Sequence, residues 1–169
     1  FTSCNKQNIS ANVNYNMATI YFDVPPKNAG ETIEAKKSIN IDLADFCKTN
    51  NLNKENIEFI RVNTVTLSTE FPEDHTFDDL EWFEMYGEAE NLPLIKLAGE
   101  SAVPLNSKVF QPSFISSDDL LPYAEKPEIE ISGRGMLRRD HPSTTRIKAD
   151  IQLSLRAVVM NLGEFNLGK

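Results

Sequence analysis

The chain has 169 residues and is acidic, with 17 lysine and arginine residues against 25 aspartate and glutamate residues and a net charge of −8. This length predicts one domain, and an apolar content of 40% suffices for a hydrophobic core. The negative charge repels phosphate backbones, which argues against nucleic acid as a partner. No stretch reaches the run of about eighteen apolar residues that a membrane-spanning helix needs.

The chain begins with a polar segment that lacks periodicity. Residues 1–11 are predicted to form a leader or tether, followed by one domain over residues 12–169. Val13, Tyr15 and Met17 then alternate with polar residues, and the apolar positions of residues 20–24 continue on the opposite parity. Such a slip predicts a β-bulge, or a strand that is covered on both faces.

A second strand, beginning near residue 33, leads into a short helix. Leu43, Phe46 and Cys47 are spaced i, i+3 and i+4, so they share one helical face. Asp42 is well placed as the N-cap and Asn50 as the end of the helix. Cys47 is therefore predicted to be a small buried apolar residue.

Two strands are predicted in the middle of the chain, before and after an acidic loop. Residues 57–69 are rich in β-branched side chains and change parity between Val62 and Val65. The segment 80–86 is predicted to be a strand with Phe83 and Met85 on one face and Trp82 and Tyr86 on the other, and a shorter strand follows at residues 94–97.

Prolines interrupt residues 99–128, where the pattern is weakest. One helical turn is predicted within residues 116–127, capped by a serine or aspartate and stopped by Pro122. Ile129 and Ile131 indicate another strand, with Gly133 and Gly135 marking a bend or bulge.

The final strand has the clearest pattern of the chain, because apolar and polar residues alternate without a break from Ile147 to Val159. This alternation predicts one buried and one solvated face. With about seven strands and one short helix, the sequence predicts an all-β protein, an antiparallel β-sandwich that is immunoglobulin-like in general architecture. A closed barrel is the alternative.

The order of these segments resembles a known group of proteins. A strand, the helix "DLADFCKTNNL", the strand "IEFIRVNTVTLST" and the segment "FDDLEWFEMYGEAENLPLIKLA" follow one another over roughly residues 35–98. In this respect the chain is similar to uncharacterised small β-sandwich lipoproteins of Bacteroidota-type bacteria. The resemblance implies a fold and a cellular setting, the bacterial outer membrane on either its periplasmic or its surface side, and no catalytic residues.

The resemblance also gives Cys4 a role. The residues before it, Phe-Thr-Ser, are similar to the end of a bacterial lipoprotein signal, after which the cysteine thiol is acylated. Cys4 is therefore the expected lipidation site, and the residues that follow would form a flexible spacer. A disulfide with Cys47 and an ordinary exposed thiol are the alternatives.

No catalytic constellation is evident, so we expect no enzymatic activity, no cofactor and no metal site. His75 and His141 are the only histidines, and neither has metal-ligand spacing. The acidic residues around His75 resemble a solvated loop and lack the glycine turn of a calcium hand. Asp140 and Ser143 flank His141, but neighbours in sequence do not establish a triad.

Three functions remain open at this stage. The leading hypothesis is a non-enzymatic, lipid-anchored accessory module that binds a protein partner in an outer-membrane assembly. The alternative is a carbohydrate-binding module in which Trp82 and Tyr86 stack on sugar rings, unless both faces of their strand are covered. An envelope hydrolase is the third, because residues 99–128 carry no interpretable pattern.

Overall fold

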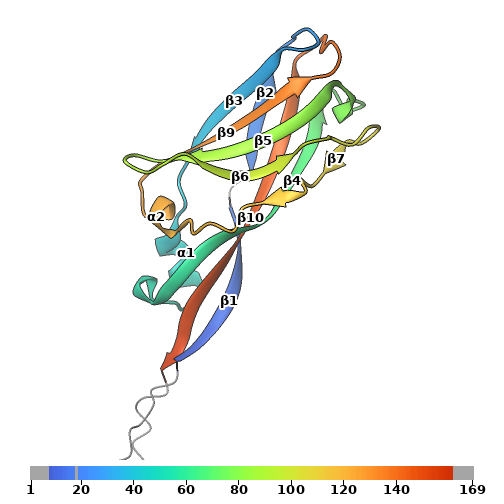
Figure 1. Cartoon of the computed structure of the whole chain (residues 1–169). Helices are drawn as coiled ribbons and strands as arrows, with labels where there is room; N and C mark the ends of the chain where they lie inside the picture. Colours follow the sequence, from blue (N-terminus) through green and yellow to red (C-terminus); the bar gives the residue numbers. More distant parts are fainter. Residues whose placement is uncertain (1–7, 18, 162–169) are drawn as a thin grey trace, which may run out of the picture.

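The computed structural model describes residues 8–17 and 19–161 and has two antiparallel sheets packed face to face (Figure 1). The strands are β1 Asn8–Asn16, β2 Ile20–Val24, β3 Thr32–Ile39, β4 Ile57–Phe71, β5 Leu80–Glu88, β6 Ile95–Glu100, β7 Val109–Phe110, β8 Phe114–Ile115, β9 Ile129–Leu137 and β10 Thr145–Asn161. The helices are α1 Leu43–Thr49 and α2 Leu121–Ala124, and the 3₁₀ turns are η1 Lys54–Asn56 and η2 Phe77–Asp79.

The first sheet has the order β1-β10-β4-β7, with β2 paired to β10 beyond the end of β1. The second sheet has the order β3-β9-β5-β6-β8. The predicted all-β sandwich is thus confirmed. The described part of the chain contains ten strands rather than about seven. The first predicted strand is divided into two, and the short strands β7 and β8, of two residues each, add to the number.

β10 is the central strand of the first sheet. As predicted, one of its faces is buried: Ala149, Ile151, Leu153, Leu155 and Ala157 each have at most 2% of their surface exposed. β1 and β2 follow one another along one side of β10. Between the pair Asn16–Gln152 and the pair Ile20–Ala149, the first strand segment has one residue more than β10. This shift of register is the bulge that the change of parity predicted. A similar shift occurs in β4 between Val62 and Thr64.

Helix α1 closes one end of the core. The Asp42 side chain caps it by accepting a hydrogen bond from the Asp45 backbone N–H at 2.9 Å, and Leu43, Phe46 and Cys47 are buried, as the spacing predicted. The Phe46 ring packs edge-on against Tyr15 with ring centroids 4.8 Å apart, which fixes the helix to β1.

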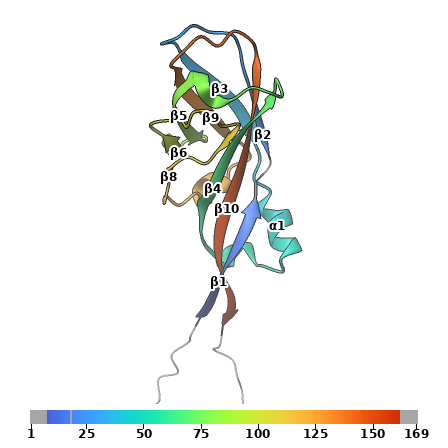
Figure 2. The ribbon, with the colours of Figure 1, turned by 90° about the vertical axis from the view of Figure 1, so that its right-hand side faces the viewer.

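β4 pairs with β10 only as far as Ala157, so beyond this residue the first sheet narrows to two strands, residues 8–10 of β1 and 158–161 of β10, which we call the terminal ribbon (Figure 2). Asn8 and Asn161 are paired at its tip. At the other end of β10, Thr145 pairs with Val24. β10 contains 17 residues, so the tip lies roughly 50 Å from this opposite end, which we call the distal pole.

Two sequence predictions need adjustment. β1 begins at Asn8, so residues 8–11 belong to the sheet and not to the predicted leader. Pro122 does not stop a helical turn but lies in the first turn of α2, where its missing N–H costs no hydrogen bond. Cys4 lies outside the described residues. Of the helices that the structure describes, none has the length and apolarity to cross a bilayer.

Candidate functional site

The predicted surface residues Trp82 and Tyr86 lie on the outer face of the second sheet. β5 alternates as expected, with Phe83 and Met85 buried in the core and Trp82 and Tyr86 on the opposite face. Both outer residues are half-buried, which is intermediate between the exposed and the covered alternatives. Their ring surface is thus partly available to a ligand.

A polar network holds Tyr86 in place. Its hydroxyl donates to Glu84 at 2.7 Å, and the Lys96 ammonium donates to the other oxygen of Glu84 at 2.6 Å. The hydrogen bonds from Lys96 and Tyr86 lower the pKa of Glu84, and the hydrogen bond to this carboxylate raises the pKa of Tyr86. The Arg134 guanidinium lies 5.2 Å from the centroid of the Tyr86 ring. The network fixes the orientation of several side chains that reach the surface.

Beside this network lies an open hollow of about 360 Å³. Trp82 and Phe114 contribute aromatic surface to it, and Glu84, Lys96 and Glu100 contribute charged groups. The exposed Phe114 ring lies 5.3 Å from the Lys96 nitrogen. We call this the Trp82 hollow. Its chemistry suits a ligand that has an apolar face and hydrogen-bonding edges.

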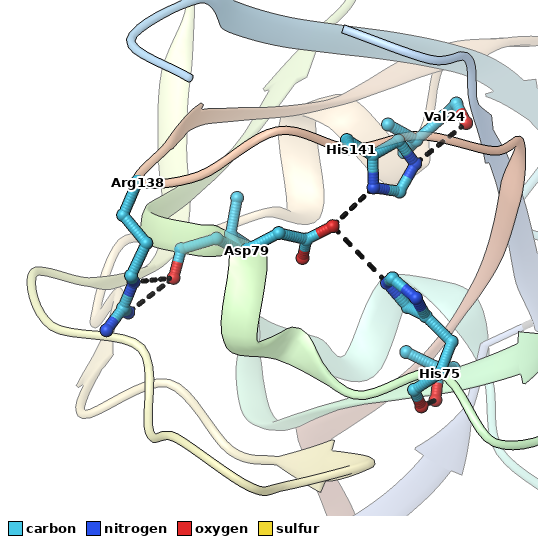
Figure 3. Close-up of polar contacts among 7 residues, drawn as sticks. Val24, His75, Asp79, Arg138 and His141 are labelled. Carbon is cyan, nitrogen blue, oxygen red and sulfur yellow. Dashed lines mark hydrogen bonds and ion pairs between the residues drawn. The ribbon is translucent and has the colours of Figure 1, made fainter. Parts of the chain in front are cut away.

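A second constellation lies at the distal pole, where His75, Asp79 and His141 converge from two loops (Figure 3). Asp79 is the last residue of η2, and His75 precedes it by one turn in the β4–β5 connection. His141 belongs to the β9–β10 connection and is held by two backbone hydrogen bonds with Lys27, of 2.8 and 3.0 Å. We call these three residues the distal cluster.

The backbone around Asp79 is also fixed. Its carbonyl accepts a hydrogen bond from the Arg138 backbone N–H at 2.8 Å, and the Arg138 guanidinium donates to the carbonyl oxygens of Leu80 and Val103. The His75 carbonyl accepts from the Thr69 hydroxyl at 2.7 Å. The fold therefore positions the distal cluster through backbone contacts that do not involve its side chains.

One oxygen of Asp79 is shared by both rings. Asp79 Oδ2 is hydrogen-bonded to His141 Nδ1 and lies 3.5 Å from His75 Nε2. His141 Nε2 donates to the Val24 carbonyl at 3.3 Å. Asp79 and His141 are buried, with 7% and 3% of their surface exposed, whereas His75 reaches the surface. The hydrogen bond to Asp79 raises the pKa of His141, although burial opposes the shift.

The sequence pattern did not predict this cluster. His75 and Asp79 are four residues apart, which was the available local signal, but His141 joins them only through tertiary structure. The neighbouring candidates do not take part: Ser143 is exposed, and Asp140 accepts from the Ala29 backbone N–H at 2.9 Å. The adjacent Asp140, His141 and Ser143 therefore form no triad.

Comparisons with known proteins give little guidance. No family model matches the chain, and no curated protein matches it. Among solved structures, it is similar to a chain in the X-ray structure of the Triatoma virus empty capsid, with 10% sequence identity, a TM-score of 0.34, and coverage of 89% of this chain and 92% of that one. A similarity this weak leaves the function to be argued from the chain's own residues.

Proposed function

We propose that this protein is a non-enzymatic binding module that is attached to the bacterial outer membrane through a lipid on Cys4 and docks a protein partner of the cell envelope. The observation that carries the proposal is the terminal ribbon, whose tip lies at one end of the molecule, roughly 50 Å from the distal pole. Attachment near Asn8 leaves both the distal pole and the side of the second sheet accessible.

A covalent lipid suits this chain as a membrane anchor, because its negative charge does not favour binding to a membrane surface. With a net charge of −8, the protein is repelled by anionic headgroups, so electrostatic adsorption to a membrane is unfavourable. Each buried CH₂ of an acyl chain contributes about 0.8 kcal/mol, and more than one chain gives stable anchoring. Cys4 precedes the start of β1 by only four residues, so the anchor would act close to the ribbon tip.

The attachment is tested by expressing the chain behind a lipoprotein signal segment in cells that are fed a radiolabelled fatty acid. The protein should incorporate the label and sediment with membranes, and Cys4→Ser should abolish both effects. Cys47→Ala is the matched control, because it removes the other thiol but keeps a small apolar side chain in the core. Labelling that survives Cys4→Ser, or that depends on Cys47, contradicts the proposed anchor.

For the partner, the docking site we propose is the Trp82 hollow. Protein interfaces are enriched in tryptophan, tyrosine and arginine, and Trp82, Tyr86 and Arg134 occur together on this face. A photo-crosslinking amino acid in place of Phe114 should give a discrete adduct in intact cells. The same amino acid in place of Tyr21, an exposed residue of the other sheet, should not give that adduct. Identical adducts from both positions would contradict docking at the hollow.

A glycan is the second candidate ligand, and the hollow itself favours it. The half-buried Trp82 ring offers a stacking surface for a pyranose, and the Glu84 and Glu100 carboxylates lie beside it as acceptors for sugar hydroxyls. Trp82 is the only tryptophan, so its fluorescence reports on this site alone. A saturable change on titration with soluble envelope glycans, absent in Tyr86→Ala but retained in Tyr21→Ala, would favour the glycan over the protein partner.

A further inference from the structure

The distal cluster contains both histidines of the chain. His75 and His141 are far apart in the sequence, yet both face the same oxygen of Asp79. The potential ligand atoms of the three residues all lie within 4.8 Å of one another. Two imidazole nitrogens and one carboxylate oxygen at such separations are a donor set typical of transition-metal sites.

We propose that His75, Asp79 and His141 form a binding site for a divalent transition-metal ion of the zinc class. In a tetrahedral site with bonds of about 2.0–2.2 Å, ligand atoms lie roughly 3.3 Å apart. The 3.5 Å between His75 Nε2 and Asp79 Oδ2 agrees with this separation. The hydrogen-bonded atoms of Asp79 and His141 are closer than this, so the two side chains would have to move apart by about half an ångström to one ångström to admit the ion.

The orientation of His141 supports the proposal independently. Its Nε2–H donates to the Val24 carbonyl, which leaves Nδ1 as the nitrogen that faces the other two residues. Histidine ligands commonly donate their second ring N–H to a carbonyl or carboxylate, because this fixes both the tautomer and the orientation of the ring. On binding, the ion would take the place of the Nδ1 proton, which leaves to solvent.

The ligand types favour a zinc-class ion over calcium or magnesium, and the partial exposure of His75 allows a water molecule to act as the fourth ligand. Calcium and magnesium prefer sites made entirely of oxygen, so two imidazoles disfavour them. Asp79 and His141 are buried and rigidly held, whereas the His75 side chain is 20% exposed. Solvent can therefore reach the site from the His75 side, and a water molecule completes the tetrahedron. The bound ion would join the β4–β5 connection to the β9–β10 connection.

The test titrates the chelator-treated chain with zinc by calorimetry and with cobalt by absorption spectroscopy. We expect one equivalent of zinc to bind and the visible bands of tetrahedral cobalt to appear. His75→Gln should weaken zinc binding at least about 10-fold. Because His75 is at the surface, this variant should fold normally, which far-ultraviolet circular dichroism verifies.

Asp74→Asn is the matched control, since it removes an exposed charge next to His75 and leaves the three ligands intact. Its zinc affinity should stay within about 3-fold of the unmodified chain at moderate salt. The proposal is overturned if zinc does not bind stoichiometrically, if His75→Gln binds it as tightly as the unmodified chain, or if excess magnesium displaces it. In that case the three residues form a structural hydrogen-bonded cluster only.

Discussion

Replacing Glu84 with glutamine removes the charge on which the polar network beside the Trp82 hollow depends. Glu84 accepts hydrogen bonds from Lys96 at 2.6 Å and from Tyr86 at 2.7 Å. Hydrogen bonds to charged groups contribute about 1.5–3 kcal/mol, but the side chains of Lys96 and Glu84 are 37% and 32% exposed, so solvent screening reduces this value. We expect Glu84→Gln to lower the free energy of unfolding by about 1–2 kcal/mol near pH 7, or the Tm by about 2–8 °C.

The pH dependence gives the sharper test. The pKa of Glu84 lies below its ordinary value of 4.5, because the hydrogen bonds from Lys96 and then Tyr86 stabilise the carboxylate. Its contribution to stability is therefore fully present above pH 4.5 and is lost as the pH falls through the folded-state pKa. The stability difference between the unmodified chain and Glu84→Gln should be largest near neutral pH and should shrink in acid.

Urea denaturation at several pH values, followed by circular dichroism, measures this difference. Glu90→Gln is the control, because Glu90 is an exposed carboxylate in the connection between β5 and β6. A stability difference for Glu84→Gln that stays constant from neutral to acidic pH would refute the electrostatic reasoning. A loss of equal size in Glu90→Gln would also refute it, because the effect would then come from the change in net charge and not from the hydrogen bonds of Glu84.

Two further predictions concern packing, and urea denaturation checks both. Gly135→Ala should lower the free energy of unfolding by about 1–3 kcal/mol, because the new Cβ would lie 2.8 Å from the Trp82 carbonyl oxygen. Gly87→Ala should lower it by less than about 1 kcal/mol, because the nearest neighbour of its Cβ lies at 3.4 Å. Equal losses would contradict the close approach of β5 and β9. Leu155→Ala, at a fully buried position of β10, should cost about 2–5 kcal/mol, and Val159→Ala, 47% exposed near the ribbon tip, less than about 0.5 kcal/mol. A loss of stability below about 1 kcal/mol in Leu155→Ala would contradict the position of β10 in the core.

Where the fold was predicted from the sequence, the signal was local and repeated. The alternation in β10 follows from burial of one face between Ala149 and Ala157, although Val159, at its predicted end, is exposed. The spacing of Leu43, Phe46 and Cys47 follows from the buried face of α1. Each pattern covers several residues, so it survives an occasional irregularity. The changes of parity were equally informative, because a bulge moves every later side chain to the other face.

What the sequence did not reveal depends on tertiary contacts. β7 and β8 contain two residues each, too few for any alternation, and are defined by pairing with β4 and β6. The distal cluster is a similar case, since Asp79 and His141 come from separate connections that are brought together by the packing of the two sheets.

The terminal ribbon determines how the module would respond to mechanical load. In an antiparallel pair such as Asn8 and Asn161, tension applied to both ends peels the ladder open one hydrogen bond at a time. In the attachment that we propose, a pull between an anchor ahead of Asn8 and a partner held on the body of the sandwich would act along β1 instead. Its hydrogen bonds with β10 are then loaded together in shear. The same attachment would thus resist dragging by a bound partner far better than it resists separation of the two chain ends.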